Sequence, residues 1–151
     1  MAKPSRRELA DLLEHVSLFS RCSQRERGTL ARHMETATLP ADSTLIEEGE
    51  DGDALFLVLE GTASVRRGGH EVLAVGPGAV FGEMALLDGE PRSATVVATS
   101  PVTVAVLGVR MFRTLLREFP EMTFELLAGL ARELRQTRDS LDTATKAGAL
   151  S

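Results

Sequence analysis

Hydrophobic residues recur at helical spacing near both ends of the chain and at strand spacing between them. In residues 5–36, Leu9 and Leu13 lie four residues apart, and further apolar residues follow in steps of three or four, which predicts a helix. Ser23 followed by Glu26 three residues later has the pattern of a capping box, which predicts the start of a second helix. We therefore expect an N-terminal helical bundle over this segment.

Residues 37–108 have the pattern of short strands separated by turns, and we expect a β-barrel here. Runs rich in Val, Ile, Leu and Thr are bounded by Gly, Pro and Asp, and the pair Gly68-Gly69 suits a tight hairpin. The expected strands are Thr44–Ile46, Leu55–Leu59, Thr62–Arg67, His70–Val75, Thr95–Ala98 and Val102–Leu107. Many short strands punctuated by glycine predict an α+β fold built on an antiparallel jelly-roll β-barrel of about eight strands.

Helical spacing returns in residues 109–142, where a proline divides the pattern into a shorter helix and a longer one. On the longer helix, Leu127, Leu134 and Leu141 repeat every seven residues. This row predicts either packing on the barrel or a seam through which two copies of the chain form a homodimer. Residues 143–151 are expected to fray.

Composition is that of an ordinary soluble domain. The 151 residues are 43% apolar and 26% charged, which suits a single domain over residues 1–151. No apolar run approaches the roughly 18 residues that span a bilayer, so we expect no membrane segment and a cytoplasmic location. The one cysteine, Cys22, fits a reducing compartment. The net charge of −5 argues against direct binding of nucleic acid through the surface.

The stretch from Phe81 to Val96 has the chemistry of an anion site beside a hydroxyl site. It begins with Gly82, where backbone can approach a ligand closely, and good helix formers follow. Unpaired N–H groups at a helix start attract anions, and the planar fork of Arg92 suits a phosphate. Glu83 would repel a phosphate but would accept a hydrogen bond from a ribose 2′-OH. A phosphate beside a sugar hydroxyl describes a cyclic nucleotide.

This stretch resembles the phosphate-binding cassette of the cyclic nucleotide-binding domain family. The family includes regulatory subunits of protein kinase A, the catabolite activator protein and cyclic-nucleotide-gated channels. Its pattern is Phe-Gly-Glu-(Leu/Met)-Ala-Leu, a short turn, then (Pro/Glu)-Arg-(Ala/Ser/Thr)-Ala-Thr-Val. Residues 81–86 and 91–96 match this pattern. The resemblance implies a ligand, cAMP or cGMP, and a short phosphate-binding helix.

The resemblance also assigns roles to individual residues. Arg92 would grip the phosphate oxygens together with neighbouring backbone N–H groups, Glu83 would accept from the ribose 2′-OH, and Gly82 would leave room for the sugar. The side chains nearest the purine would be Val65 and, depending on register, Val72 or Leu73, on two strands that equally suit the barrel core. The binding residues implied are Gly82, Glu83, Met84, Ala85, Arg92, Ser93, Ala94, Val65 and Leu73.

The preference between the two ligands depends partly on Ser93. In relatives that prefer cGMP, a hydroxyl residue often follows the phosphate-binding arginine and bonds the guanine amino group, yet serine also stands there in cAMP-responsive bacterial members. One such bond contributes about 0.5–1.5 kcal/mol. The sequence favours cAMP. A cap over the base would come from Phe124 or from an arginine of the last helix: Arg132, Arg135 or Arg138.

No catalytic or metal-binding pattern accompanies this stretch, so we expect a binding module and not an enzyme. His15, His33 and His70 are scattered, whereas a metal-dependent barrel enzyme needs clustered histidines. We expect a regulatory module that passes ligand occupancy to an effector through its C-terminal helices, which the resemblance implies act as a hinge and a lid. Leu86 and Leu87 would carry the shift of the short phosphate-binding helix to the hinge near Phe112. One alternative is a ligand-free interaction scaffold, which the pair of Glu83 and Arg92 disfavours because an idle pocket would leave Arg92 as a costly unpaired charge. Another is the sensor half of a transcription regulator, lacking its DNA-binding part.

Overall fold

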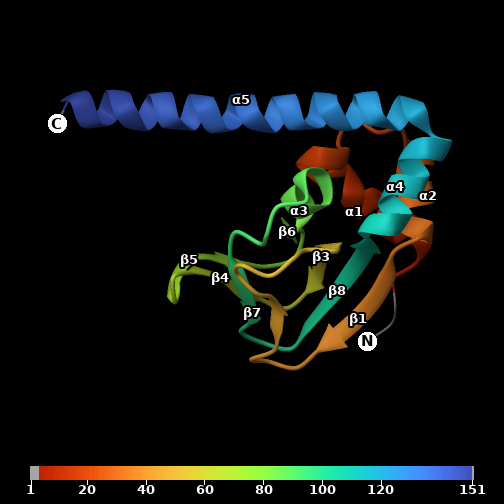
Figure 1. Ribbon diagram of the computed structural model, residues 1–151, viewed down its shortest axis with the longest axis horizontal. Helices are drawn as coiled ribbons and strands as arrows, with labels where there is room; N and C mark the ends of the chain where they lie inside the picture. The colour runs from red at the N-terminus through yellow and green to blue at the C-terminus, as the bar shows by residue number, and fades with distance from the viewer. Residues whose placement is uncertain (1–3, 151) are drawn as a thin grey trace.

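The structure is a computed structural model that describes the backbone of residues 4–150, and their side chains apart from positions 17, 84–86 and 145–150. The helices formed by the two ends of the chain lie together on one side of the strands formed by its middle (Figure 1). The elements in chain order are α1 (Arg6–Glu14), η1 (Ser17–Phe19), α2 (Gln24–Arg32), β1 (Glu35–Leu39), β2 (Thr44–Ile46), β3 (Ala54–Glu60), β4 (Ala63–Arg67), β5 (His70–Val75), β6 (Val80–Phe81), α3 (Glu83–Asp88), β7 (Thr95–Ala98), β8 (Val102–Gly108), α4 (Val109–Glu118) and α5 (Pro120–Leu150).

The predicted strands agree with the structure to within one residue at each end, and two further strands, β1 and β6, were not given ranges from the sequence. The capping box at the start of α2 is confirmed: the Ser23 hydroxyl accepts from the Glu26 backbone, and the Glu26 carboxylate accepts from the Ser23 backbone. Local capping chemistry thus fixes where the second helix begins.

The strands are antiparallel, as expected, but they do not close into a barrel. The strands divide into two four-stranded antiparallel sheets, ordered β1-β8-β3-β6 and β2-β7-β4-β5. At their edges, β6 has two residues and β2 has three. Strands this short carry few hydrogen bonds, so they do not join the two sheets into one continuous ladder. Glycine residues between the strands predict turns, but they do not predict whether the strands close into a barrel.

Strand alternation divides the first sheet between two cores. On β3, Leu55 and Leu57 face the helices and join a core that includes Phe19, Phe112 and Met122. Phe56 and Val58, which alternate with them on β3, face the second sheet and pack with Phe81 and Val96, among others. Because successive strand residues point to opposite faces, one strand serves both cores. The first sheet is therefore the middle layer, with helices on one side and the second sheet on the other.

The last helix is longer than expected. It continues to Leu150, so the prediction that residues 143–151 fray is wrong for its backbone up to that residue. Its start packs on the core through Met122 and Leu126 and contacts η1, whereas its distal half extends past the sheets (Figure 1). Along the described part of the chain, no helix combines enough length with enough apolar character to cross a membrane.

Candidate functional site

The start of the candidate site is a sharp turn between β6 and α3. Gly82 has φ +91°, in the left-handed region that favours glycine. A Cβ atom there would lie 2.5 Å from the Ala54 carbonyl oxygen and 2.5 Å from Arg92 Nη1. Glycine is therefore required both by the backbone angle and by the close approach of Arg92. The expected role of Gly82 beside a sugar remains a prediction.

Arg92 is held in place by hydrogen bonds of both its backbone and its side chain. Its backbone N–H donates to the Glu50 carbonyl at 2.8 Å, and its carbonyl accepts from Gly49 N at 2.9 Å. Its guanidinium donates to the carbonyls of Ala54 (2.9 Å) and Gly82 (3.3 Å). The side chain is only 8% exposed. Burial lowers the pKa of Arg92, while the nearby carboxylates of Asp53 and Glu83 act to raise it.

These bonds change one argument made from the sequence. An idle pocket was expected to leave Arg92 as an unpaired buried charge, but two backbone carbonyls already accept from it. A guanidinium has five N–H donors, so further donors can still meet an anion. The conformation of Arg92 is set before any ligand arrives.

Glu83, the first residue of α3, has a buried carboxylate oxygen without a hydrogen-bond partner among the described residues. Its Oε2 atom is buried and accepts no hydrogen bond in the described part of the structure. The pKa of the Glu83 carboxyl is raised, mainly by burial and further by the charge of Glu133 on α5. A bond from its own backbone N–H and the charge of Arg92 oppose this shift. A buried carboxylate oxygen without a donor is unfavourable. A hydroxyl donor placed beside it would remove that penalty.

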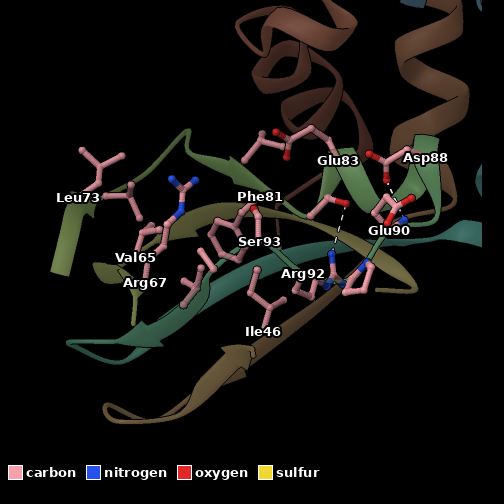
Figure 2. Close-up of a pocket in the computed structure, with 16 residues that line it drawn as sticks. Ile46, Val65, Arg67, Leu73, Phe81, Glu83, Asp88, Glu90, Arg92 and Ser93 are labelled. Carbon is pink, nitrogen blue, oxygen red and sulfur yellow. Dashed lines mark hydrogen bonds between the residues drawn. The ribbon is translucent and has the colours of Figure 1, made fainter. Parts of the chain in front are cut away.

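A pocket of about 390 Å³ gathers most of the residues expected from the sequence (Figure 2). The expected residues that line it are Gly82, Glu83, Arg92, Ser93, Ala94, Val65 and Leu73. The backbone of Met84 and Ala85 lies in the first turn of α3, where N–H groups lack partners within the helix, but their side chains are outside the described part. Phe124, expected above the base, is 71% exposed and does not line the pocket, nor do the three arginines of α5.

A β-bulge explains why Leu73, and not Val72, faces the pocket. Val65 on β4 pairs with Leu73, and Arg66 pairs with Glu71, so Val72 has no residue directly opposite. The extra residue reverses the side to which β5 presents its side chains beyond that point. Periodicity alone left this choice open, because a shift of one residue exchanges the two faces.

Several pocket residues were missed from the sequence. Arg67 and Val75 follow Val65 and Leu73 at two-residue spacing, which is the strand rule for one shared face and was a usable signal. Ile46 comes from β2, which lies beside β7 and has no local signal for the pocket. The remaining residues missed are Val80, Phe81, Asp88, Glu90, Pro91 and Val96.

A smaller cavity of about 200 Å³ lies on the other side of Glu83. It is lined by residues from the end of α1, η1 and α5, including His15 and Glu133. Glu83 thus belongs to the walls of both cavities and lies between the larger pocket and the last helix. Among the side chains that the structure describes, no three His, Cys, Asp or Glu residues come close enough together to hold a metal ion.

The geometry can be compared with known proteins. The family described as "Cyclic nucleotide-binding domain" matches residues 36–119, which include both sheets, α3 and α4. The chain belongs to the cyclic nucleotide-binding domain family. The turn at Gly82, the buried Arg92 and the aliphatic strands β4 and β5 all lie within the matched residues.

The relatives of this domain are regulatory proteins and channels. The chain is 42% identical to a cAMP-dependent protein kinase regulatory subunit of Aspergillus niger over 113 residues, 74% of this chain and 28% of that protein. It is similar to the crystal structure of the N-terminal domain of a transcriptional regulator from Streptomyces coelicolor A3(2), with TM-score 0.76, 35% identity and coverage of 86% of this chain and 94% of that one. The cAMP-bound PfPKA-R structure matches with TM-score 0.71 and 27% identity, over 93% of this chain and 47% of that one. The chain spans 24–28% of the length of the kinase regulatory subunits of Hypocrea atroviridis and Aspergillus niger.

Proposed function

We propose that this domain binds a cyclic nucleotide, preferentially cAMP, and regulates an effector through its C-terminal helices. The observation that carries the proposal is the composition of one pocket: a buried cation, an unpartnered carboxylate oxygen and an aliphatic wall. These three features suit a phosphate, a ribose hydroxyl and a purine respectively. Relatives named for cAMP, including the cAMP-bound PfPKA-R structure, support the choice of ligand.

In the proposed complex, each part of the ligand meets chemistry that it needs. Free N–H donors of Arg92 and backbone N–H groups at the start of α3, and at Ser93 and Ala94, neutralise the phosphate. The 2′-OH of the ribose donates to Glu83 and satisfies its buried oxygen. The purine lies against Val65 and Leu73, whose exposed apolar surface it covers.

Two adjacent carbonyls offer a route from the phosphate to the helices. The Ala54 carbonyl accepts from the Arg92 guanidinium at 2.9 Å, and the Asp53 carbonyl accepts from Val109 N, the first residue of α4, at 2.8 Å. Any shift of Arg92 towards a ligand therefore acts on the same short backbone segment that holds α4. The route expected from the sequence ran through Leu86 and Leu87; the first side chain is outside the described part, and the second is exposed.

Titration calorimetry tests the binding. We expect wild-type protein to bind cAMP, and Arg92→Ala to bind it roughly 10²–10³-fold more weakly, since breaking a buried charge interaction costs about 3–5 kcal/mol. Arg25→Ala, which removes an exposed arginine on α2, is the matched control and should bind as wild type does. Wild-type protein that binds neither cAMP nor cGMP would overturn the proposal.

Hydrogen exchange tests the coupling. If ligand occupancy moves the C-terminal helices, protection over residues 109–142 should change when cAMP is added, and should not change in Arg92→Ala. Binding without any change in that segment would leave a ligand site and remove the proposed regulation.

We also propose that α5 is able to pair with a second copy of this chain. Leu127, Leu134 and Leu141 are all more than half exposed on one side of the helix, whereas Leu130 packs on the core. A row of leucines at seven-residue spacing suits a helix–helix seam. Sedimentation of wild type and of Leu134→Ser should give a dimer for the first and a monomer for the second; a wild-type monomer at high concentration contradicts the proposal.

A further inference from the structure

The pocket contains a second arginine, Arg67, at the end opposite Arg92 (Figure 2). Arg67 ends β4 and lies two residues after Val65, so the two side chains share the face that lines the pocket. The ladder between β4 and β7 is regular from Ala63 to Arg66, so the side chains of β4 alternate between its two faces up to the residue before Arg67. The intervening Arg66 lies on the other face, where its Nε donates to Ser64 Oγ at 3.1 Å.

The side chain of Arg67 differs from that of Arg92 in its hydrogen bonds. The Arg92 guanidinium donates to two carbonyls, whereas the Arg67 guanidinium makes no hydrogen bond or ion pair with any residue whose side chain the structure describes. The side chain of His70, which pairs with Arg67 in the ladder, is exposed and does not bond to that guanidinium. The guanidinium projects beside Leu73, on the open side of the pocket (Figure 2). Its donors are therefore available to a ligand.

The chemistry of a guanidinium restricts the kind of ligand edge to which it can bind. It has only donors, arranged as a planar fork, so it needs a ligand edge with acceptors. If the phosphate lies at Arg92, as in the proposed function on which this inference rests, the purine lies at the Val65–Leu73 end and its edge reaches Arg67. Guanine and hypoxanthine present two adjacent acceptors, O6 and N7, which an arginine binds in bidentate fashion. Adenine presents N7 beside an amino donor, which a guanidinium cannot satisfy.

We infer that Arg67 is a specificity-determining residue that binds the O6/N7 edge of a 6-oxopurine, so that cGMP and cIMP compete with cAMP at this pocket. This contact differs from the one expected for Ser93, which would read the 2-amino group of guanine. The two contacts are separable, because hypoxanthine has the O6/N7 edge but has no 2-amino group.

Three ligands and three variants test this inference by calorimetry. Arg67→Met retains an unbranched apolar stem and removes the donors; it should bind cGMP and cIMP about 5- to 10-fold more weakly, the lower part of the range for a bidentate contact, with cAMP changed less than about 2-fold. Arg67→Gln should shift selectivity further towards cAMP, because a glutamine amide can pair with adenine N6 and N7. Arg66→Met is the matched control and should leave all three affinities unchanged.

The outcomes separate this inference from the proposed function. A selective loss of cGMP and cIMP in Arg67→Met supports it. Equal losses for all three ligands, no change at all, or a loss for cGMP without one for cIMP would each overturn it, while cAMP binding by wild type keeps the proposed function intact. If wild type binds no cyclic nucleotide, both the inference about Arg67 and the proposed function are wrong. A thermal unfolding midpoint matched to wild type shows that each variant is folded.

Discussion

The two ends of the pocket are built in opposite ways. Arg92 lies at the end where the phosphate is proposed to bind, and it is only 8% exposed. Its position is fixed by hydrogen bonds to two carbonyls and by the absence of a side chain at Gly82. At the purine end, Leu73 is 57% exposed on an edge strand, and Arg67 has no partner among the described side chains. One end is preorganised and the other is incomplete until something covers it.

This difference indicates how the two ends would contribute to binding. A group held in place before the ligand arrives loses little conformational entropy on binding, so changes at the fixed end should affect affinity strongly and equally for every cyclic nucleotide. Changes at the exposed end remove contacts that water partly replaces, so their effects should be smaller and should depend on the base. Substitutions at the two ends test this contrast, beginning with the largest effect.

Gly82→Ala should produce the largest loss among the substitutions that compare the two ends. The new Cβ would lie 2.5 Å from both the Ala54 oxygen and Arg92 Nη1, at a φ of +91°. We expect cAMP and cGMP binding to weaken together by about 100-fold, or ~2.7 kcal/mol, because Arg92 must move. Titration calorimetry of both ligands measures this effect.

Gly78→Ala is the control for backbone strain. Gly78 has φ +92°, but no atom lies within 4 Å of the place that a Cβ would occupy, so its substitution adds the same strain without displacing Arg92. We expect it to lower the free energy of unfolding by about 1–2 kcal/mol and to leave affinity nearly unchanged. Equal effects of the two variants on affinity would show that Arg92 need not be held in place.

Glu83→Gln should have an intermediate effect. The substitution removes the charge that strengthens a bond from the ribose hydroxyl, and we expect about 10-fold weaker binding of cAMP. The affinity for 2′-deoxy-cAMP, which lacks that hydroxyl, should hardly change. A double-mutant cycle between the residue and the hydroxyl isolates this contact, and a loss of the same size for both ligands would contradict it.

The same carboxyl gives a pH dependence whose sign is fixed. Burial raises its pKa above 4.5 in the folded protein. Its ionisation therefore destabilises the unliganded fold above that raised pKa, and the penalty disappears as the pH falls towards 4.5. Glu83→Gln should accordingly be more stable than wild type at neutral pH, with a smaller difference near the unperturbed value. Ribose binding favours the ionised form, so wild-type affinity should rise with pH while that of the variant stays flat.

The sequence predicts most of this fold because its signals are local. The capping box of Ser23 and Glu26 and the run His70–Val75 are each set by neighbours within a few residues, and both are confirmed. Whether strands close into a barrel depends on hydrogen bonds between strands distant in the sequence, and here the strands form two separate sheets. The length of α5 was also misjudged, because polar and small residues near its end gave no apolar period to follow.

The candidate site divides in the same way. Gly82, Glu83 and Arg92 lie in one ordered motif, and the structure brings all three to one pocket. Arg67 and Ile46 lie outside that motif, and their places depend on strand face and sheet order. Neither the two carbonyl partners of Arg92 nor its burial has a sequence signal, since a backbone carbonyl belongs to every residue type.

The smallest effect is expected at the exposed end, from Leu73→Ala. The side chain is already 57% exposed, so only the part that a purine would cover is lost. At about 0.8 kcal/mol for each buried methylene, partial contact predicts roughly 2- to 5-fold weaker binding of cAMP in a calorimetric titration. Val72→Ala is a close control, because Val72 is 54% exposed on the same strand but lies at the bulge and does not line the pocket. It should bind as wild type does. If the two variants lose equal affinity, or if Leu73→Ala approaches the loss expected for Gly82→Ala, the purine end is as preorganised as the phosphate end and the contrast between them is wrong.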